Sequence, residues 1–183
     1  MESMIERFKT EFHQIAKPSL FEVTLVFPSG NEVAAQFLCK GASVPTRTIG
    51  KIDLSYMGRK VVVPGDTSFS DWSVTVYNDR NFTIRRRLEE WAELINGAFT
   101  NLADTVEAHG LKRTMTVKHL DGKGFPIKTY YMIGCMPTSV GSAIDLSWER
   151  TDTAEEYSVD FAYDYWESDT TKGTNAGGGF NVG

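Results

Sequence analysis

Three observations predict a mainly β fold, an antiparallel barrel or sandwich with a helix packed on it. Seven to nine segments have the composition and alternation of strands. One substantial internal segment has helical periodicity instead. Strands and helices do not alternate along the chain, which excludes the parallel sheet of βαβ proteins.

A single domain is expected, because 183 residues suit one hydrophobic core. Hydrophobic residues make up 41% of the chain and aromatic residues 12%, which favours a folded soluble protein. No apolar run is long enough to span a membrane, and the N-terminus lacks the apolar core of a secretory signal. Cys39 and Cys135 are expected to be buried free thiols of a reducing cytoplasm.

The first third of the chain predicts a helix and two hairpins. Apolar residues at helical spacing predict a short N-terminal helix ending before Pro18; they are Met4, Ile5, Phe8, Phe12 and Ile15. Residues 20–27 and 32–40 alternate around the turn PSGN, which predicts a hairpin. Residues 41–66 predict a longer hairpin around the turn MGR. Because it has few large apolar groups for its length, we expect an arm that packs on something else.

Residues 68–95, SFSDWSVTVYNDRNFTIRRRLEEWAELI, predict a strand, a corner and a helix. The strand has an inward stripe of Trp72, Val74 and Val76, and residues 78–81 supply the corner and the helix cap. An apolar stripe then follows helical spacing; it consists of Ile84, Leu88, Trp91 and Ile95. The arginines at 85–87 have glutamates three and four residues away, so at least two should have intrahelical partners on a solvated face.

The rest of the chain predicts further strands and a tail. Residues 114–120 and 125–136 form a hairpin around DGKG, and residues 143–148 and 155–166 complete the strands. In the last strand the residues on one face are Tyr157, Val159, Phe161, Tyr163 and Tyr165. The Gly-rich residues 168–183 are flexible by composition, which leaves residues 1–167 as the domain.

The charge pattern argues against nucleic-acid binding, and the absence of catalytic motifs argues against enzyme activity. Residues 145–169 hold nine acids and one base, and such a surface repels phosphate. The three histidines are scattered without metal-ligand spacing, and no nucleophile or phosphate-loop motif occurs. We therefore expect no enzyme activity, no cofactor and no metal.

Long stretches of the chain resemble the tail tube protein of contractile-tailed bacteriophages. They are KPSLFEVTLVF, VPTRTIGKIDLSYMGRKVVVPGD, FSDWSVTVYNDRNF, RRLEEWAELI, MPTSVGSAIDLSW and FAYDYW. The resemblance covers residues 1–167 in order. It implies two roughly orthogonal antiparallel sheets forming a small barrel with a flanking helix and a long hairpin arm. It also implies hexameric rings stacked into a tube, one sheet of each subunit joining its neighbours around a lumen.

The resemblance implies contacts between rings through the arm and the N-terminal segment; the candidates are Met4, Phe8, Ile49, Ile52, Leu54, Tyr56, Met57, Arg59 and Lys60. The helix arginines Arg85, Arg86 and Arg87 are candidates for contact with the sheath or with neighbours. The lumen must not hold DNA, so acids should face it, with Asp53, Asp160 and Asp164 as candidates.

The implied partners are further copies, the tail sheath protein, a baseplate tube initiator, the tape-measure protein and genomic DNA that passes without specific binding. The expected location is the virion tail, after assembly in the host cytoplasm. Two alternatives stay open: a tube initiator or type VI secretion-like tube subunit, and a monomeric β-sandwich with an aromatic-lined ligand pocket.

Overall fold

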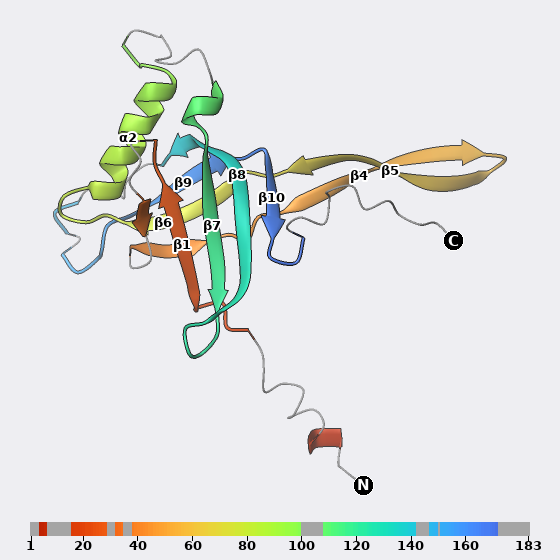
Figure 1. Ribbon diagram of the computed structural model, residues 1–183, viewed down its shortest axis with the longest axis horizontal. Coiled ribbons are helices and arrows are strands. Elements are labelled where there is room, and N and C mark those ends of the chain that lie inside the picture. Colours follow the sequence, from red (N-terminus) through yellow and green to blue (C-terminus); the bar gives the residue numbers. More distant parts are fainter. Residues whose placement is uncertain are drawn as a thin grey trace.

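The computed structural model describes residues 4–6, 16–28, 32–34, 38–99, 108–141, 147–149 and 151–171. Its elements are β1 (Phe21–Val26), β2 (Glu32–Ala34), β3 (Cys39–Ala42), β4 (Arg47–Tyr56), β5 (Arg59–Phe69), β6 (Trp72–Tyr77), α2 (Thr83–Ile95), the 3-10 turn η3 (Ala108–Leu111), β7 (Arg113–Leu120), β8 (Pro126–Val140), β9 (Glu156–Ala162) and β10 (Tyr165–Ser168). Eight strands form one antiparallel sheet in the order β2-β1-β7-β8-β9-β6-β3, with β10 paired to β8 (Figure 1). β4 and β5 form a separate ladder. The predicted mainly β fold with a flanking helix and a hairpin arm is confirmed.

The large sheet folds over at β8, its longest strand. The first part of β8 pairs with β7 on one edge and β10 on the other, whereas its last residues pair with β9. Gly134 lies where the partner changes and has a φ of 73°, which favours glycine. A Cβ at this residue would also lie 2.1 Å from Oδ2 of Asp164. The bend therefore depends on glycine.

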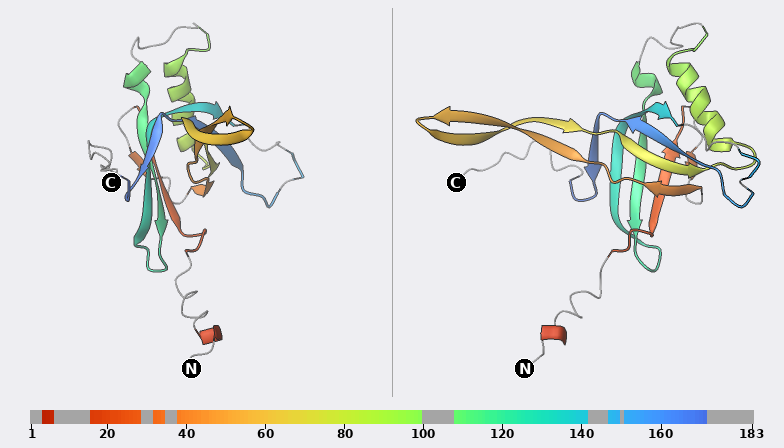
Figure 2. Two further views of the ribbon diagram at one scale, coloured as in Figure 1. Left: turned by 90° about the vertical axis from the view of Figure 1, so that its right-hand side faces the viewer. Right: turned by 180° about the vertical axis from the view of Figure 1, so that it is seen from behind.

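The two halves of the sheet cross at a steep angle (Figures 1 and 2). One half contains β1 and β7, the other β6 and β9. This arrangement matches the expected small barrel of orthogonal layers, although the barrel of a single subunit is not closed. The end strands β2 and β3 do not pair with each other, because β2 has three residues and β3 continues toward the arm instead of returning to β2.

The core lies between the two halves, and α2 closes its flank. The helix buries Ile84, Leu88 and Trp91, the stripe that the sequence predicted. The Trp91 ring centroid lies 6.1 Å from that of Phe27 and 6.3 Å from that of Phe161, so it contacts both halves of the sheet. Its Nε1 donates to the Leu111 carbonyl over 3.0 Å, which satisfies the buried donor.

Three strand predictions need correction. Residues 32–40 are not one strand: β2 pairs with β1, but Cys39 begins β3, which pairs with β6. Residues 155–166 divide into β9 and β10, because Asp164 breaks the ladder and its N–H donates to the Ile133 carbonyl. Of the predicted strand 143–148, Ser147 and Trp148 are not in a strand and the rest lies outside the described residues.

The helix α2 is capped by a side chain of the preceding corner and not by the residue directly before the helix. Phe82, the residue before the helix, is left-handed with a φ of 53° and contributes no side-chain cap. Asp79 does so instead: its carboxylate accepts from the Thr83 N–H and from the Thr83 hydroxyl, both over 2.7 Å. The hydrogen bond to the Thr83 side chain is the main reason why the pKa of Asp79 lies below its usual value. The predicted capping role of residues 78–81 thus falls to Asp79.

Asp79→Ala should lower the free energy of unfolding by about 1 kcal/mol, the usual contribution of a helix cap. Because the pKa is lowered in the folded state, this contribution is complete above the unfolded pKa of about 4 and disappears as the pH falls through the folded value. Urea unfolding at pH 7 and at pH 3 should show a smaller difference between variant and parent at pH 3. An equal difference at both pH values would contradict a role for the charged carboxylate.

Candidate assembly surfaces

The arm is a β-hairpin that leaves the body of the subunit on one side (Figures 1 and 2). β4 and β5 pair from Arg47↔Phe69 at the root to Tyr56↔Arg59 at the tip. Met57 and Gly58 form the turn with φ values of 47° and 76°, the left-handed pair that a two-residue hairpin loop requires. The predicted MGR turn is confirmed. The hairpin spans residues 47–69 and not the predicted 41–66, since Gly41 belongs to β3 and the ladder continues to Phe69.

A bulge divides the arm into a root and an outer part. The register shifts between Ile49 and Lys51, opposite Gly65 and Asp66. A Cβ on Gly50 would lie 3.0 Å from the Asp66 carbonyl oxygen, so the strands approach closely here. Pro64 lies beside the shift and has no N–H to donate. We call residues 47–49 and 67–69 the arm root.

Beyond the bulge the arm has two unlike faces, because directly paired residues share a face of an antiparallel ladder. The ladder pairs Ile52 with Val63, Leu54 with Val61 and Tyr56 with Arg59. We call Ile52, Leu54, Tyr56, Val61 and Val63 the apolar arm face. The opposite face carries Lys51, Asp53, Ser55, Lys60 and Val62.

The apolar arm face is exposed to solvent in the single subunit. Its five side chains have exposed fractions from 37% for Val63 to 72% for Tyr56. The turn residue Met57 is 86% exposed. Contiguous apolar surface of this kind marks a site of protein association. The sequence singled out Ile52, Leu54 and Tyr56 but missed Val61 and Val63, which the register from the MGR turn would have placed on the same face.

The other predicted ring-contact residues lie in several places. Ile49 belongs to the arm root, Arg59 borders the apolar arm face, and Lys60 lies on the polar face. Met4 is 90% exposed in the short helical stretch 4–6. Phe8 lies outside the described residues.

The three helix arginines have different surroundings. Arg85 pairs with Glu89 over 3.0 Å and lies over the Tyr157 ring. Arg87 lies over the Phe27 ring, and its Nη1 is buried without a hydrogen-bond partner among the described residues. Arg86 is exposed. Only Arg85 has an intrahelical ion pair in the described part of the chain, so the expectation of two such pairs was too high.

The three acids predicted to face the lumen lie in different parts of the structure. Asp53 is exposed on the polar face of the arm. Asp164 lies at the β8 bend and pairs with Lys112 over 2.6 Å, which offsets its charge. Asp160 shares the outer face of the second sheet half with hydroxyl residues, because it pairs with Ser73 and Ser139 in the ladders.

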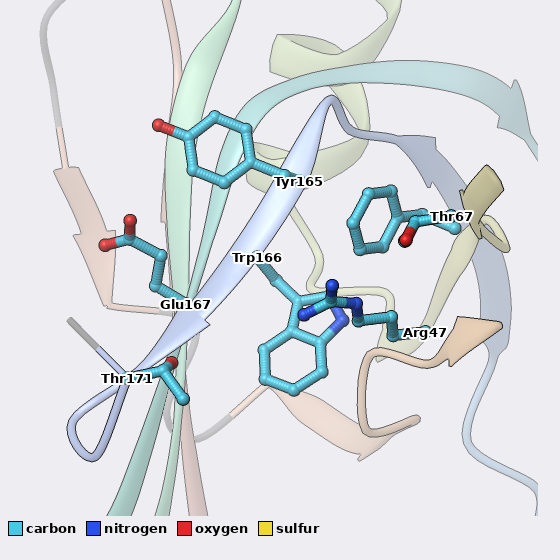
Figure 3. Close-up of a pocket in the computed structure, with 7 residues that line it drawn as sticks. Arg47, Thr67, Tyr165, Trp166, Glu167 and Thr171 are labelled. Carbon is cyan, nitrogen blue, oxygen red and sulfur yellow. The ribbon is translucent and has the colours of Figure 1, made fainter. Parts of the chain in front are cut away.

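A pocket of about 350 Å³ lies between the arm root and β10 (Figure 3). Its lining residues are Arg47, Thr67, Phe69, Tyr165, Trp166, Glu167 and Thr171. The sequence reasoning assigned none of them a role, although FAYDYW marks an aromatic cluster. Three consecutive residues of β10 line it, and since side chains alternate along a strand, the pocket follows the edge of β10.

Other kinds of site are not found in the described part of the chain. No group of three or more His, Cys, Asp or Glu residues there could hold a metal ion. No helix there is both long and apolar enough to cross a membrane. Cys39 and Cys135 are both free thiols, but only Cys135 is buried as expected and Cys39 is half-buried.

The arm exposes apolar side chains, and the end strands of the sheet do not pair with each other. Comparison with known proteins identifies the family. The profile of the family described as "Phage tail tube protein" matches residues 16–169. The chain belongs to this family. As a tail tube protein it is a structural component of the virion and not an enzyme, as the sequence predicted.

Named tail tube proteins are similar over most of their length. Tail tube protein gp19 of Enterobacteria phage T4 is 29% identical over 157 residues, which cover 86% of this chain and 94% of that protein. The tail tube protein of Serratia phage KSP90 is 27% identical, covering 83% and 88%. The prediction of a tail tube protein of contractile-tailed phages is confirmed by the family match and these relatives.

Solved structures share the fold at low identity. A chain of the sheath-tube complex of an extracellular contractile injection system in its extended state has a TM-score of 0.61 at 12% identity, covering 92% of this chain and 98% of that one. A chain of the anti-feeding prophage baseplate has a TM-score of 0.62 at 12% identity, covering 86% and 97%. This tail tube protein therefore has the fold of chains from contractile injection systems.

Proposed function

We propose that this chain is the repeating subunit of the inner tube, assembled as hexameric rings that stack into a conduit and penetrating needle. One observation carries the proposal: the apolar arm face extends into water from a subunit whose sheet is not closed. Pairing between subunits would cover the free edges of β2 and β3, which otherwise invite aggregation. The contacts that the arm cannot make within one copy would then be made between rings.

The other partners follow from this role. The solved relatives include a sheath-tube complex, a baseplate and a tube terminator, which supports a sheath and a baseplate initiator as partners here. We further propose that the tape-measure protein fills the lumen during assembly in the host cytoplasm, and that genomic DNA later passes through it. Specific DNA binding by the wall would hinder passage.

Among the lumen candidates, Asp160 has the strongest support. It lies on a face where its neighbours in the ladders are Ser73, Ser139 and Ser158, and Lys40, at the other end of this face, is paired with Glu156. A hydroxyl-rich, weakly acidic wall neither attracts phosphate nor offers apolar surface to bases. An Asp160→Cys thiol should react with a maleimide on a large polymer in free subunits but not in tubes. Equal labelling in both states would remove Asp160 from the lumen.

Arg86 is the helix arginine available to the sheath, because Arg85 and Arg87 lie over rings of their own subunit. Arg86→Gln should leave stability within about 0.5 kcal/mol of the parent, as surface changes usually do. It should weaken co-sedimentation of sheath protein with preformed tubes at low salt. Arg80→Gln, an exposed arginine before the helix, is the matched control. Equal sheath binding by both variants would contradict the contact.

Negative-stain electron microscopy of the purified chain at several concentrations tests the proposed function. Hollow tubes of uniform width are expected. Single rings or short stubs that never lengthen would favour a baseplate initiator instead. Monomers at every concentration, even with an initiator added, would overturn the proposal and favour a β-sandwich that binds a ligand in the aromatic pocket at the arm root.

A further inference from the structure

The pocket at the arm root has the features of a docking site for protein. Among the described strands β10 pairs with β8 alone, and three consecutive residues of β10 line the pocket together with the arm root. The aromatic residues Phe69, Tyr165 and Trp166 supply apolar surface, and Arg47 and Glu167 supply charge (Figure 3). Trp166 Nε1 is buried and donates to no acceptor among the described residues. A buried donor without a partner calls for an explanation, and an incoming group would provide one.

We propose that this pocket receives the arm tip of a second copy of the chain, head to tail. The inference rests on the proposed function, since it identifies the surface that the arm contacts. The arm tip consists of Tyr56, Met57, Gly58, Arg59 and Lys60, which are all exposed in the single subunit. The arm cannot reach its own pocket, because it points away from the body and its tip lies roughly 30 Å along the strand from Thr67.

The shape of the tip suits the pocket. Met57 has a flexible thioether side chain that adapts to irregular apolar surfaces, and it is 86% exposed. Tyr56 offers an aromatic ring and a hydroxyl, the combination that is frequent in the buried centre of protein interfaces. The pocket offers aromatic rings of the same kind, Tyr165 and Trp166, on opposite sides of β10 (Figure 3). The backbone of the tip can also pair with the free edge of β10.

Charge favours the same pairing. The tip, residues 56–60, has two bases, Arg59 and Lys60, and no acid, whereas the pocket lining has one acid, Glu167, and one base, Arg47. Glu156, Asp164 and Asp169 already pair with lysines of their own subunit. Glu167 has no ion pair within the described residues, and neither do Arg59 and Lys60 of the tip. Glu167 is therefore the acidic partner that the pocket offers to the basic tip, and this pairing guides the two surfaces into register.

This contact has a consequence for symmetry. The tip and the pocket are different surfaces of one chain, so their contact is heterologous and leaves a free tip and a free pocket at the ends of any chain of copies. Repetition then gives a polymer. If two arms instead packed antiparallel on each other, each would cover the apolar face of the other, and assembly would stop at a dimer.

Cross-linking in the full chain separates these arrangements. Met57→Cys and Thr67→Cys in one chain place a thiol at the tip and another in the pocket, both at exposed positions. Burial raises the pKa of the native Cys39 and Cys135 thiols to about 11 and about 12, so they react little at pH 8. Oxidised glutathione added after assembly should give a ladder of covalent oligomers on a denaturing gel. Met57→Cys with Asp152→Cys, an exposed acid outside the pocket, is the control and should give none.

Each other result has a defined meaning. Tubes in the microscope without a ladder would overturn the tip–pocket contact but keep the proposed function. A ladder that stops at the dimer would replace it by antiparallel arms. Absence of tubes from the parent chain would overturn the proposed function itself.

A charge exchange provides a second, independent readout. Glu167→Lys alone, and Arg59→Glu with Lys60→Glu, should each raise the concentration needed for tubes at least about tenfold, a typical effect of like charges at a contact. Combining all three changes should bring it back to within about threefold of the parent. Additive losses in the combined variant would overturn the contact.

Discussion

Leu54→Asp should abolish tube assembly while the subunit stays folded. Leu54 is at the centre of the apolar arm face and is 53% exposed in the single subunit, so little burial is lost there. In the tube, the change removes about 2 kcal/mol of apolar burial and places a charge in an apolar contact, at a further cost of at least about 1 kcal/mol. A loss of about 3 kcal/mol per contact raises the concentration needed for assembly at least about 100-fold.

Ser55→Asp is the matched control, because Ser55 is the next residue on the same strand and lies on the opposite, polar face of the arm. Both variants place aspartate in β4, so any effect on strand propensity is shared. Pelleting assays and negative-stain images should show tubes for Ser55→Asp and none for Leu54→Asp at the same concentration. Thermal unfolding should give similar midpoints for both free subunits. Tubes from Leu54→Asp at parental concentration would show that the apolar arm face is not buried in assembly.

Trp91→Ala should be the most destabilising single change considered. Trp91 is fully buried and contacts rings from both halves of the sheet, and its Nε1 holds η3 through the Leu111 carbonyl. Large-to-small changes of this kind cost about 3–5 kcal/mol. For a domain of this size that corresponds to a fall of about 10 °C in the thermal midpoint.

The control for that change is Trp148→Ala, which removes the same side chain from a position that is 102% exposed. Its midpoint should stay within about 2 °C of the parent. The two variants should be compared as free subunits by differential scanning calorimetry. A small effect of Trp91→Ala would mean that α2 is not essential for joining the two halves of the sheet.

The sequence predicted those parts of the fold in which local pattern decides the structure. The stripe Ile84, Leu88 and Trp91 follows helical spacing, and α2 buries these three residues. Alternation of Ile52, Leu54 and Tyr56 around the MGR turn predicted the arm, since both strands lie next to each other in sequence. Asp79 was placed in the capping corner because its residue type is typical of caps.

The pairing of strands that are distant in the sequence could not be predicted from local residue patterns. Residues 32–40 alternate as one strand, but Cys39 pairs with Val76 in the other half of the sheet. The bend of β8 depends on the positive φ of Gly134, which an apolar strand sequence does not announce. Local pattern therefore did not show that the barrel of a single subunit is open. The pocket was missed for the same reason, because it combines the arm root with a strand about 100 residues later.

The arm leaves the body of each subunit on one side only. A tube made of such copies in parallel rings has two chemically distinct ends. One end would present arms with apolar side chains in water and, if the arm docks on the next copy as proposed, the other would present vacant acceptor surfaces. Growth and capping are then separate recognition problems: a protein that stops the tube at the first end must cover the arms, whereas one that starts it at the other must imitate them. The subunit sequence itself thereby gives the tail its direction.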